Sequence, residues 1–288
     1  MQTNPSFGTL YVVGTPIGNL EDMTVRAVRT LQEADLIAAE DTRHTGKLLG
    51  HFQVTTPQIS YYEHNQQQRI PELLNKLRQG KSIALVTDAG MPGISDPGYE
   101  LVKACWEAEI GVVPIPGVSA CVTALSAAGI ACDRFVFEGF LPTKGKARQE
   151  RLEALKPESR ALVLYESPHR LRQTLADLAT TLGRERPIAI ARELTKLHEE
   201  IWRGNLHQSL DRYTEIQPQG EFTLILAGAT AAKIFLSEDV LKDELTKMMK
   251  QGISRSQASR QLAQQTELSR RKLYQLALEI ELSDRSDN

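Results

Sequence analysis

Short runs of apolar residues, each followed by a polar or glycine-rich turn, recur along most of the chain. Runs of four to six apolar residues rich in valine and isoleucine are typical of strands buried on both faces. The segments between them carry apolar residues at helical spacing, as in residues 21–34. This alternation predicts an α/β fold with mainly parallel sheets. The predicted strands form two series, which indicates two α/β domains: residues 10–13, 36–39, 83–86 and 112–115, then 135–137, 161–165, 188–191 and 222–227.

The end of the chain has a different pattern, because no strand-like run follows residue 228. Residues 238–282 instead predict three short helices, and the last two resemble a helix-turn-helix unit. We therefore expect an N-terminal α/β domain over residues 1–116 and a second α/β domain over 117–232. A small all-α module is expected over 233–288.

The predicted helical module is locally basic. Residues 247–272 hold seven lysines and arginines and one acidic residue, Glu267. Such a concentration of positive charge is typical of a surface that binds phosphate backbones. A solvated helix face has the same composition, and the module is equally compatible with dimerisation or packing. Nucleic-acid binding is thus one of the open interpretations of this segment.

The composition excludes several classes of protein. The chain has 288 residues, of which 41% are hydrophobic and 24% charged, and its net charge is −2. These values are typical of a globular protein and exclude a disordered chain or a coiled coil. The three cysteines form no C-x-x-C pair, which indicates reduced thiols. We expect a cytoplasmic protein with no metal, because there is no membrane-spanning run, signal peptide or H-E-x-x-H motif.

Three loops dense in glycine and proline follow predicted strands, at residues 14–19, 87–98 and 114–120. Ligands of open α/β sheets bind beyond the carboxyl ends of the strands. Glycine lets a ligand approach the backbone closely, and proline lowers the entropic cost of ordering a loop. The three loops together therefore predict a ligand pocket. It is not a common nucleotide site, because the first loop lacks G-x-G-x-x-G and no Walker A motif precedes a helix.

Polar clusters lie beside the same predicted strands, at residues 40–43, 61–65, 165–170 and 191–196. A single cluster of this kind is often a helix cap or a structural ion pair. Four clusters at the same sheet edges indicate a polar substrate cleft.

Several of these segments together resemble the ribosomal RNA small-subunit methyltransferase I family, within the tetrapyrrole-methylase superfamily. The resemblance is carried by LYVVGTPIGNLEDMT, AAEDTRHT, YEHN, VTDAGMPGISDPGYELV, PIPGVSA, FEGFLP, YESPHRL and ARELTKLHEE, in this order over residues 10–200. It implies a two-domain tetrapyrrole-methylase-like fold with S-adenosylmethionine bound between the two domains. It also implies homodimers and 2′-O-methylation of cytidine 1402 in the 16S rRNA of the small ribosomal subunit.

The resemblance also implies which residues bind the cofactor. They are Pro16, Ile17, Ala89, Gly90, Met91, Ile94, Ser119, Ala120, Glu166 and Leu194. The chain departs from the superfamily in two loops. The first loop reads GTPIG where relatives that act on tetrapyrroles have G-x-G-P-G. Met91 stands where threonine is usual, so a backbone contact is retained but a hydroxyl contact is lost.

Methyl transfer from a sulfonium to a ribose hydroxyl requires in-line positioning and is helped by a base near the hydroxyl. The candidate catalytic residues are Glu40, Asp41, Arg43, His64 and Lys196, and Lys196 would need a lowered pKa to act as the base. The candidate RNA-binding residues are Arg170, Arg192, Arg255, Arg260, Arg270, Arg271 and Lys272. Two alternatives stay open: a methyltransferase of a small molecule such as a tetrapyrrole, and a ligand-sensing regulator that binds duplex DNA.

Overall fold

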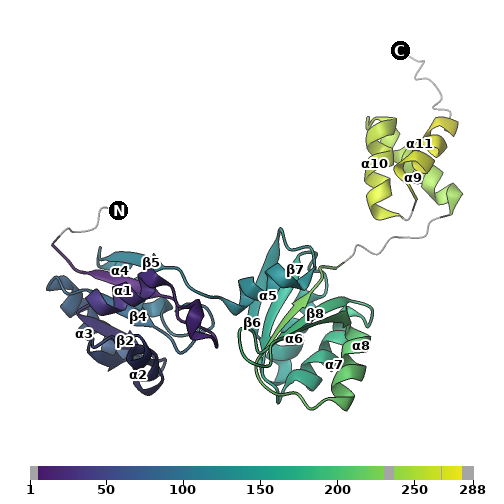
Figure 1. Cartoon of the computed structure of the whole chain (residues 1–288). Coiled ribbons are helices and arrows are strands. Elements are labelled where there is room, and N and C mark those ends of the chain that lie inside the picture. The colour runs from purple at the N-terminus through teal and green to yellow at the C-terminus, as the bar shows by residue number, and fades with distance from the viewer. Residues whose placement is uncertain (1–5, 230–236, 267, 281–288) are drawn as a thin grey trace. The chain divides into compact units, whose positions relative to one another are not determined.

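The structure is a computed structural model, and it describes residues 6–229, 237–266 and 268–280 (Figure 1). The chain divides into two compact units, one ending at Gly228 and the other beginning at Ala229. The first unit contains two five-stranded sheets, and the second contains helices α9 to α11. The predicted boundary between residues 232 and 233 lies outside the described residues. Within those residues no helix combines the length and apolar character needed to cross a membrane.

The strands are β1 (Thr9–Val13), β2 (Leu36–Ala39), β3 (Gln58–Ser60), β4 (Ile83–Val86), β5 (Gly111–Ile115), β6 (Phe135–Phe140), β7 (Ala161–Glu166), β8 (Pro187–Arg192), β9 (Glu200–Asn205) and β10 (Phe222–Leu226). The helices are a short 3₁₀ turn η1 (Leu20–Asp22), α1 (Val25–Glu33), α2 (Thr42–His51), α3 (Gln66–Arg78), α4 (Tyr99–Glu107), α5 (Ala120–Ala128), α6 (Gly145–Leu155), α7 (Leu171–Leu182), α8 (Leu206–Glu215), α9 (Glu238–Lys250), α10 (Arg255–Gln265) and α11 (Arg270–Glu279).

The first sheet has the order β3-β2-β4-β1-β5, and all of its pairings are parallel. Leu31 of α1 and Leu49 of α2 pack on one face, and Leu73 of α3 and Leu101 of α4 pack on the other. Every residue of the central strand β4 is consequently buried. This half of the unit confirms the predicted parallel α/β architecture, and it brings the carboxyl ends of its strands to one edge.

The second sheet has the order β6-β7-β10-β8-β9 and differs from the prediction of mainly parallel sheets. Only the β6–β7 pair is parallel, whereas β10 pairs antiparallel with β7 and β8, and β8 pairs antiparallel with β9. A strand that is covered on both faces is apolar throughout, whether its neighbours are parallel or antiparallel to it. The hydrophobic pattern therefore did not distinguish the two directions. Strand β9 was missed altogether, because its sequence EIWRGN has no apolar run.

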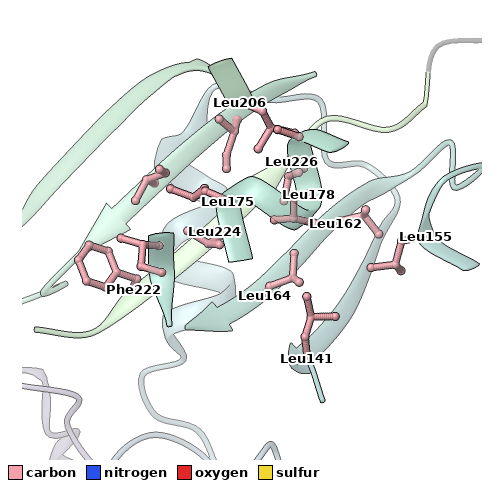
Figure 2. Packing of buried hydrophobic residues seen from close by; sticks show 14 of the residues in the cluster. Leu141, Leu155, Leu162, Leu164, Leu175, Leu178, Leu206, Phe222, Leu224 and Leu226 are labelled. Carbon is pink, nitrogen blue, oxygen red and sulfur yellow. The ribbon is translucent and has the colours of Figure 1, made fainter. Parts of the chain in front are cut away.

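Helices cover both faces of the second sheet. Figure 2 shows the larger cluster, in which Leu162, Leu164 and Leu224 of the sheet meet Leu175 and Leu178 of α7. On the opposite face α5 packs through a smaller set of apolar side chains against β7, β8 and β10. The predicted boundary near residue 116 falls between β5 of the first sheet and this helix.

The second unit is a three-helix module, as the sequence predicts. Ser237, Ser254 and Ser269 cap the starts of α9, α10 and α11 by accepting backbone hydrogen bonds. Serine is a favoured residue at this position because its hydroxyl satisfies a backbone N–H that has no partner within the helix. Leu245 and Leu273 are fully buried in the core between the helices.

Candidate functional site

Backbone contacts join the three loops at the carboxyl ends of the first sheet. The Gly14 N–H donates to the Ile115 carbonyl at 3.1 Å. Thr15 and Gly90 exchange two backbone hydrogen bonds, of 2.9 and 3.1 Å. A Cβ atom on Gly14 would lie 2.7 Å from the Cα of Gly117, so the absence of side chains permits the close approach of the first and third loops. The loops therefore form one connected rim.

This rim and the second sheet line a cavity of about 210 Å³, which we call the first cavity. Eight of the predicted cofactor-binding residues lie in its wall: Ile17, Ala89, Gly90, Met91, Ile94, Ser119, Ala120 and Leu194. The second sheet adds Tyr165, Ala191, Phe222 and Thr223, and carboxylates come from Asp96 and Glu221. The wall is thus mainly apolar, with acidic groups at two places.

Pro16 and Glu166 do not line the first cavity, although we expected both to do so. Pro16 lines the neighbouring cavity described below. Successive residues of a strand point to opposite faces, so Tyr165 faces the cavity and Glu166 points away from it. The buried carboxylate of Glu166 accepts hydrogen bonds from Thr174 Oγ1 at 2.6 Å and from the Ser167 N–H at 2.7 Å. Glu166 therefore holds the start of α7 in place.

A second cavity, of about 490 Å³, adjoins the first, because Ile17, Ala89 and Glu221 line both. The remaining walls of the second cavity are Pro16, Gly18, Leu20, His44, Lys47, Leu48, Asp88 and Lys196. Lys196 packs closely on the first loop, since a Cβ atom on Gly18 would lie 2.4 Å from the Lys196 Cγ.

Carboxylates gather where β2 and β4 end. The Asp88 N–H donates to Glu40 Oε2 at 3.2 Å, and the Asp41 N–H donates to Asp88 Oδ1 at 3.3 Å. Burial and the charge of Asp88 raise the pKa of Glu40, although the hydrogen bond from Asp88 opposes them. Burial, together with the charges of Glu40 and Asp88, raises the pKa of Asp96 to about 7. A carboxylate with a pKa near neutrality can accept and release a proton under ordinary conditions.

Asp96 carries no motif that marks it as a site residue in the sequence. It lies in the ISDPG segment of the second loop, where aspartate followed by proline is typical of a plain turn. The signal that could have found it was its position in the same loop as the predicted cofactor residues Met91 and Ile94. Glu221 gave no signal at all, because it precedes β10 far along the chain.

Asp41 and Arg43 pair with each other at the start of α2. Arg43 Nη2 donates to Asp41 Oδ2 at 2.7 Å, and the Arg43 side chain is 89% exposed. Asp41 also accepts the backbone N–H of Arg43 and so caps the helix. The hydrogen bonds from Arg43 hold the pKa of Asp41 well below its usual range. Asp41 is therefore a weaker proton acceptor than Glu40 or Asp96.

His64 lines neither of the two cavities. It is exposed on the turn between β3 and α3, where its ring lies edge-on to the ring of Tyr62 at 6.4 Å. His64 does not share a cavity with Lys196, so its catalytic role stays a prediction.

Lys196 is held between two carboxylates. Its Nζ lies 3.0 Å from Glu193 Oε1 and 2.9 Å from Glu221 Oε2. Burial lowers the pKa of Lys196, but the hydrogen bonds to Glu221 and Glu193 outweigh burial and leave the pKa raised. The role of proton acceptor required a lowered pKa, so the structure contradicts that hypothesis. Lys196 instead orients Glu221, which faces both cavities.

The backbone is strained around the first cavity. Ser95, which lines it, has a φ of 63°, and Glu193 and Thr195, which flank the lining residue Leu194, have φ values of 50° and 67°. Non-glycine residues rarely adopt positive φ, and such conformations gather at binding and catalytic sites. The segment that carries Leu194 and Lys196 is therefore held in a special geometry.

Two predicted RNA-binding arginines of the first unit have partners within the fold. Arg170 Nη2 donates to the Leu141 carbonyl at 2.7 Å, and Arg192 Nε donates to the Gln219 carbonyl at 2.8 Å. Both guanidinium groups thereby fix loops of the second sheet, a role that the sequence did not indicate.

The three-helix module brings two of its predicted RNA-binding residues together. Arg270 and Arg271 line a shallow hollow with Ser256 and Tyr274, and Arg270 Nη2 donates to Ser256 Oγ at 2.9 Å. Arg260 is exposed on α10.

The other two predicted residues of the module have internal partners. Arg255 Nη2 donates to the Ile280 carbonyl at 3.3 Å, next to the end of α11. Lys272 Nζ lies 3.4 Å from Glu238 Oε1. Both are therefore less available to a phosphate than Arg270 and Arg271.

Comparison with known proteins shows the family of this chain. Residues 9–209 match the family described as Tetrapyrrole (Corrin/Porphyrin) Methylases. The chain is 62% identical to a Synechocystis sp. protein named "Ribosomal RNA small subunit methyltransferase I", over 95% of this chain and 99% of that one. A Streptococcus pyogenes protein of the same name is 46% identical over 96% of this chain and 98% of its own. This chain belongs to the ribosomal RNA small subunit methyltransferase I family.

Solved structures show that the family fold is the one described above. The uroporphyrin-III-C-methyltransferase of Thermus thermophilus superposes with a TM-score of 0.56 at 24% identity, over 76% of this chain and 94% of that one. Another structure of a Thermus thermophilus uroporphyrin-III C-methyl transferase, titled as complexed with S-adenyl homocysteine, has the same TM-score at 18% identity and covers 76% and 97%. This chain thus shares its α/β fold with these two structures.

Proposed function

We propose that this chain transfers a methyl group from S-adenosylmethionine to the 2′-oxygen of cytidine 1402 in the 16S rRNA of the small ribosomal subunit. The observation that carries the proposal is the first cavity, in which eight residues implied by the family resemblance meet in one wall. The near full-length similarity to proteins named for small-subunit rRNA methylation supports the choice of substrate.

The chemistry of the first cavity suits S-adenosylmethionine. That cofactor, when bound, supplies a methyl group on a positively charged sulfonium. Ile17, Met91, Leu194 and Phe222 offer apolar surface for the flat adenine ring and for the methylene groups beside the sulfonium. Asp96 and Glu221 offer negative charge to the cationic part. Backbone groups of the second loop, kept open by glycine at position 90, are available for polar contacts.

The chain's own contribution to the reaction is positioning and proton removal. Two reactants held in line gain up to roughly 7–11 kcal/mol relative to free encounter. The connected loops supply a rigid frame for this alignment. Asp96, with its raised pKa, and Glu40 behind Asp88 are the groups best suited to accept the proton of the ribose hydroxyl. We place Asp96 first, because it faces the first cavity directly.

The three-helix module is proposed to hold RNA outside the cavities. Arg270 and Arg271 face a common hollow with the aromatic side chain of Tyr274, and such a combination suits phosphates and an unstacked base. We also propose a homodimer, as the family resemblance implies, and a cytoplasmic location, where small ribosomal subunits are found.

Methyl transfer to small ribosomal subunits that lack the modification tests the function. The purified chain is incubated with these subunits and methyl-labelled S-adenosylmethionine, and the labelled nucleoside is identified after digestion of the RNA. Label in 2′-O-methylcytidine is the expected result. Cofactor binding without transfer to subunits or free 16S rRNA would point to a different acceptor, such as a tetrapyrrole. Failure to bind the cofactor would favour a ligand-sensing regulator.

A further inference from the structure

The second cavity differs from the first in its charge. Lys47 and His44 project from α2, whose exposed face forms one wall. Neither side chain has a hydrogen bond or an ion pair with another described residue. The charge of His44 acts on the nearby Glu40 carboxylate, whereas Lys47 has no acidic partner among the described residues and is free to bind an anion.

The other charged groups of the second cavity are already engaged. Lys196 lies between Glu193 and Glu221, so its positive charge is offset. Asp88 accepts the Asp41 N–H and lies beside Glu40. Negative charge is therefore concentrated toward the end of β4, and the unpaired positive charge lies on the α2 side. A ligand of the second cavity should present its anionic group to α2 and hydroxyl or amino groups to Asp88.

The apolar part of the second cavity also indicates the kind of ligand. Pro16, Leu20 and Leu48 line it, and Leu20 is 40% exposed. A flat base can pack against such side chains once it has left the stack. The volume of about 490 Å³ lies within the range of roughly 300–1,000 Å³ that is common for small-ligand pockets.

We propose, on the basis of the RNA methyl transfer proposed above, that the second cavity receives the target nucleotide of the RNA. Lys47 and His44 bind a phosphate next to the target ribose, and Pro16, Leu20 and Leu48 contact the base. The shared wall of Ile17 and Ala89 places the ribose beside the first cavity, where the cofactor is proposed to bind. Lys47 and His44 are thus RNA-positioning residues that the sequence analysis did not identify.

The test separates binding of RNA from binding of cofactor in the full-length chain. Lys47→Ala, Lys47→Glu, Lys47→Arg and His44→Ala are compared with the wild-type chain. Lys103→Ala is the matched control, because Lys103 is an exposed lysine of α4 whose nearest carboxylate, Glu107, is 4.0 Å away. KM and kcat are measured with small ribosomal subunits lacking the modification, and cofactor affinity is measured by calorimetry.

Loss of a phosphate contact should raise KM for the subunits and leave cofactor affinity unchanged. We expect KM to rise about tenfold in Lys47→Ala, somewhat less in His44→Ala, and further in Lys47→Glu. Lys47→Arg should retain a KM close to that of the wild type, and kcat should change less than KM in all of them. The slope of log KM against log salt should fall by about 0.7 in Lys47→Ala, as expected for one phosphate contact with single-stranded RNA.

Three outcomes would overturn the proposal. KM values within twofold of the wild type in both Lys47→Ala and Lys47→Glu would show that no phosphate binds there. A loss of cofactor affinity equal to the rise in KM would assign the second cavity to the cofactor. The same rise in Lys103→Ala would reduce the effect to general surface charge. If the wild-type chain transfers no methyl group to the subunits, the proposed function is wrong as well. If instead the Lys47 variants are as active as the wild type, only the proposed nucleotide site is wrong.

Discussion

The α/β unit and the three-helix module use charged side chains in opposite ways. Around the two cavities, Glu40, Asp88, Glu221 and Lys196 are joined to one another or to the backbone, and their charges are therefore held in place. In the module, Arg270 and Arg271 face a hollow whose wall holds no acidic side chain among the residues that the structure describes. Fixed charges suit chemistry at a defined atom, whereas unpaired surface charges suit a grip on a polyanion. The difference indicates that fixed charges around the cavities select the reacting atom, where Lys47 and His44 are proposed to hold one phosphate, whereas the module adds affinity for the rest of the RNA.

The strongest test of the rigid α/β site is Gly14→Ala. The new Cβ atom would lie 2.7 and 2.8 Å from backbone atoms of Gly117, which cannot move without separating the first and third loops. We expect the free energy of unfolding to fall by about 1–3 kcal/mol and cofactor affinity to weaken more than tenfold. Urea unfolding and calorimetric titration with S-adenosylmethionine measure the two effects.

Gly50→Ala is the matched control for this glycine substitution. Gly50 lies in α2, and nothing approaches within 4 Å of a Cβ atom built there. Alanine should stabilise the helix by roughly 0.5–1 kcal/mol and leave cofactor affinity unchanged. If Gly14→Ala has the stability and cofactor affinity of the wild type, the loops are not rigidly joined. The contrast between a rigid α/β site and a module that uses surface charge would then be wrong.

The module should respond to charge removal without any change at the cavities. The double substitution Arg270→Ala with Arg271→Ala removes both cations from the hollow. We expect affinity for 16S rRNA to fall about tenfold at moderate salt, and the slope of log affinity against log salt to fall by about 1.4 if each arginine meets one phosphate. Cofactor affinity should be unchanged. Fluorescence anisotropy with labelled RNA over a salt series measures both quantities.

Lys242→Ala provides the comparison within the module, because Lys242 is already paired with Glu279 at 2.7 Å. Its loss should change RNA affinity by less than about twofold. An unchanged salt slope in the arginine double variant would instead favour a packing or dimerisation role for the module.

The sequence was sufficient for four of the five strands of the first sheet and for the loops of the site, but the short strand β3 was not predicted. Buried apolar runs such as residues 83–86 predict strands directly, and the glycine and proline at their ends predict the loops. The same reasoning was insufficient for the second sheet, where strands β7, β8 and β10 have the composition of parallel strands but pair antiparallel. Strand direction depends on how the chain returns to the sheet, and local composition does not record this.

The predictions of single site residues also differ between the first and the second sheet. Residues of the first-sheet loops, such as Ala89 and Ser119, could be predicted because motif and pocket lie in one segment. Tyr165 lines the first cavity and Glu166 does not, because a shift of one strand position reverses the face on which a side chain lies. Glu221 and Phe222 reach the first cavity from a strand far along the chain, so no local pattern marks them. Lys196 lines the second cavity, but its pKa depends on Glu193 and Glu221, which only the folded chain brings to it.

The last substitution concerns Asp96 and the pH dependence of stability. Its pKa is raised to about 7 in the folded chain by burial and by the charges of Glu40 and Asp88. The folded state therefore binds more protons than the unfolded state between about pH 4 and 7, and stability falls as the pH rises through this window. Asp96→Asn removes this cost, so the variant should be more stable than the wild type at pH 8 by about 1 kcal/mol, a shift in Tm of roughly 2–4 °C. The difference should shrink toward pH 4.

Asp96→Asn should lower kcat although it raises stability. Asp96 is therefore the most informative residue for testing a site built from fixed charges. If its carboxylate accepts the ribose proton, kcat of the wild type rises as the pH passes about 7 and then levels, because only the ionised form is a base. Asp96→Asn should lose most of this activity and the inflection near neutrality, although it is the more stable protein. Thermal unfolding and kcat between pH 5 and 9 decide the matter. If Asp96→Asn keeps the wild-type dependence of kcat on pH, Asp96 is not the base and Glu40 becomes the candidate. If Asp96→Asn is less stable than the wild type at pH 8, Asp96 stabilises the fold and its burial has no electrostatic cost.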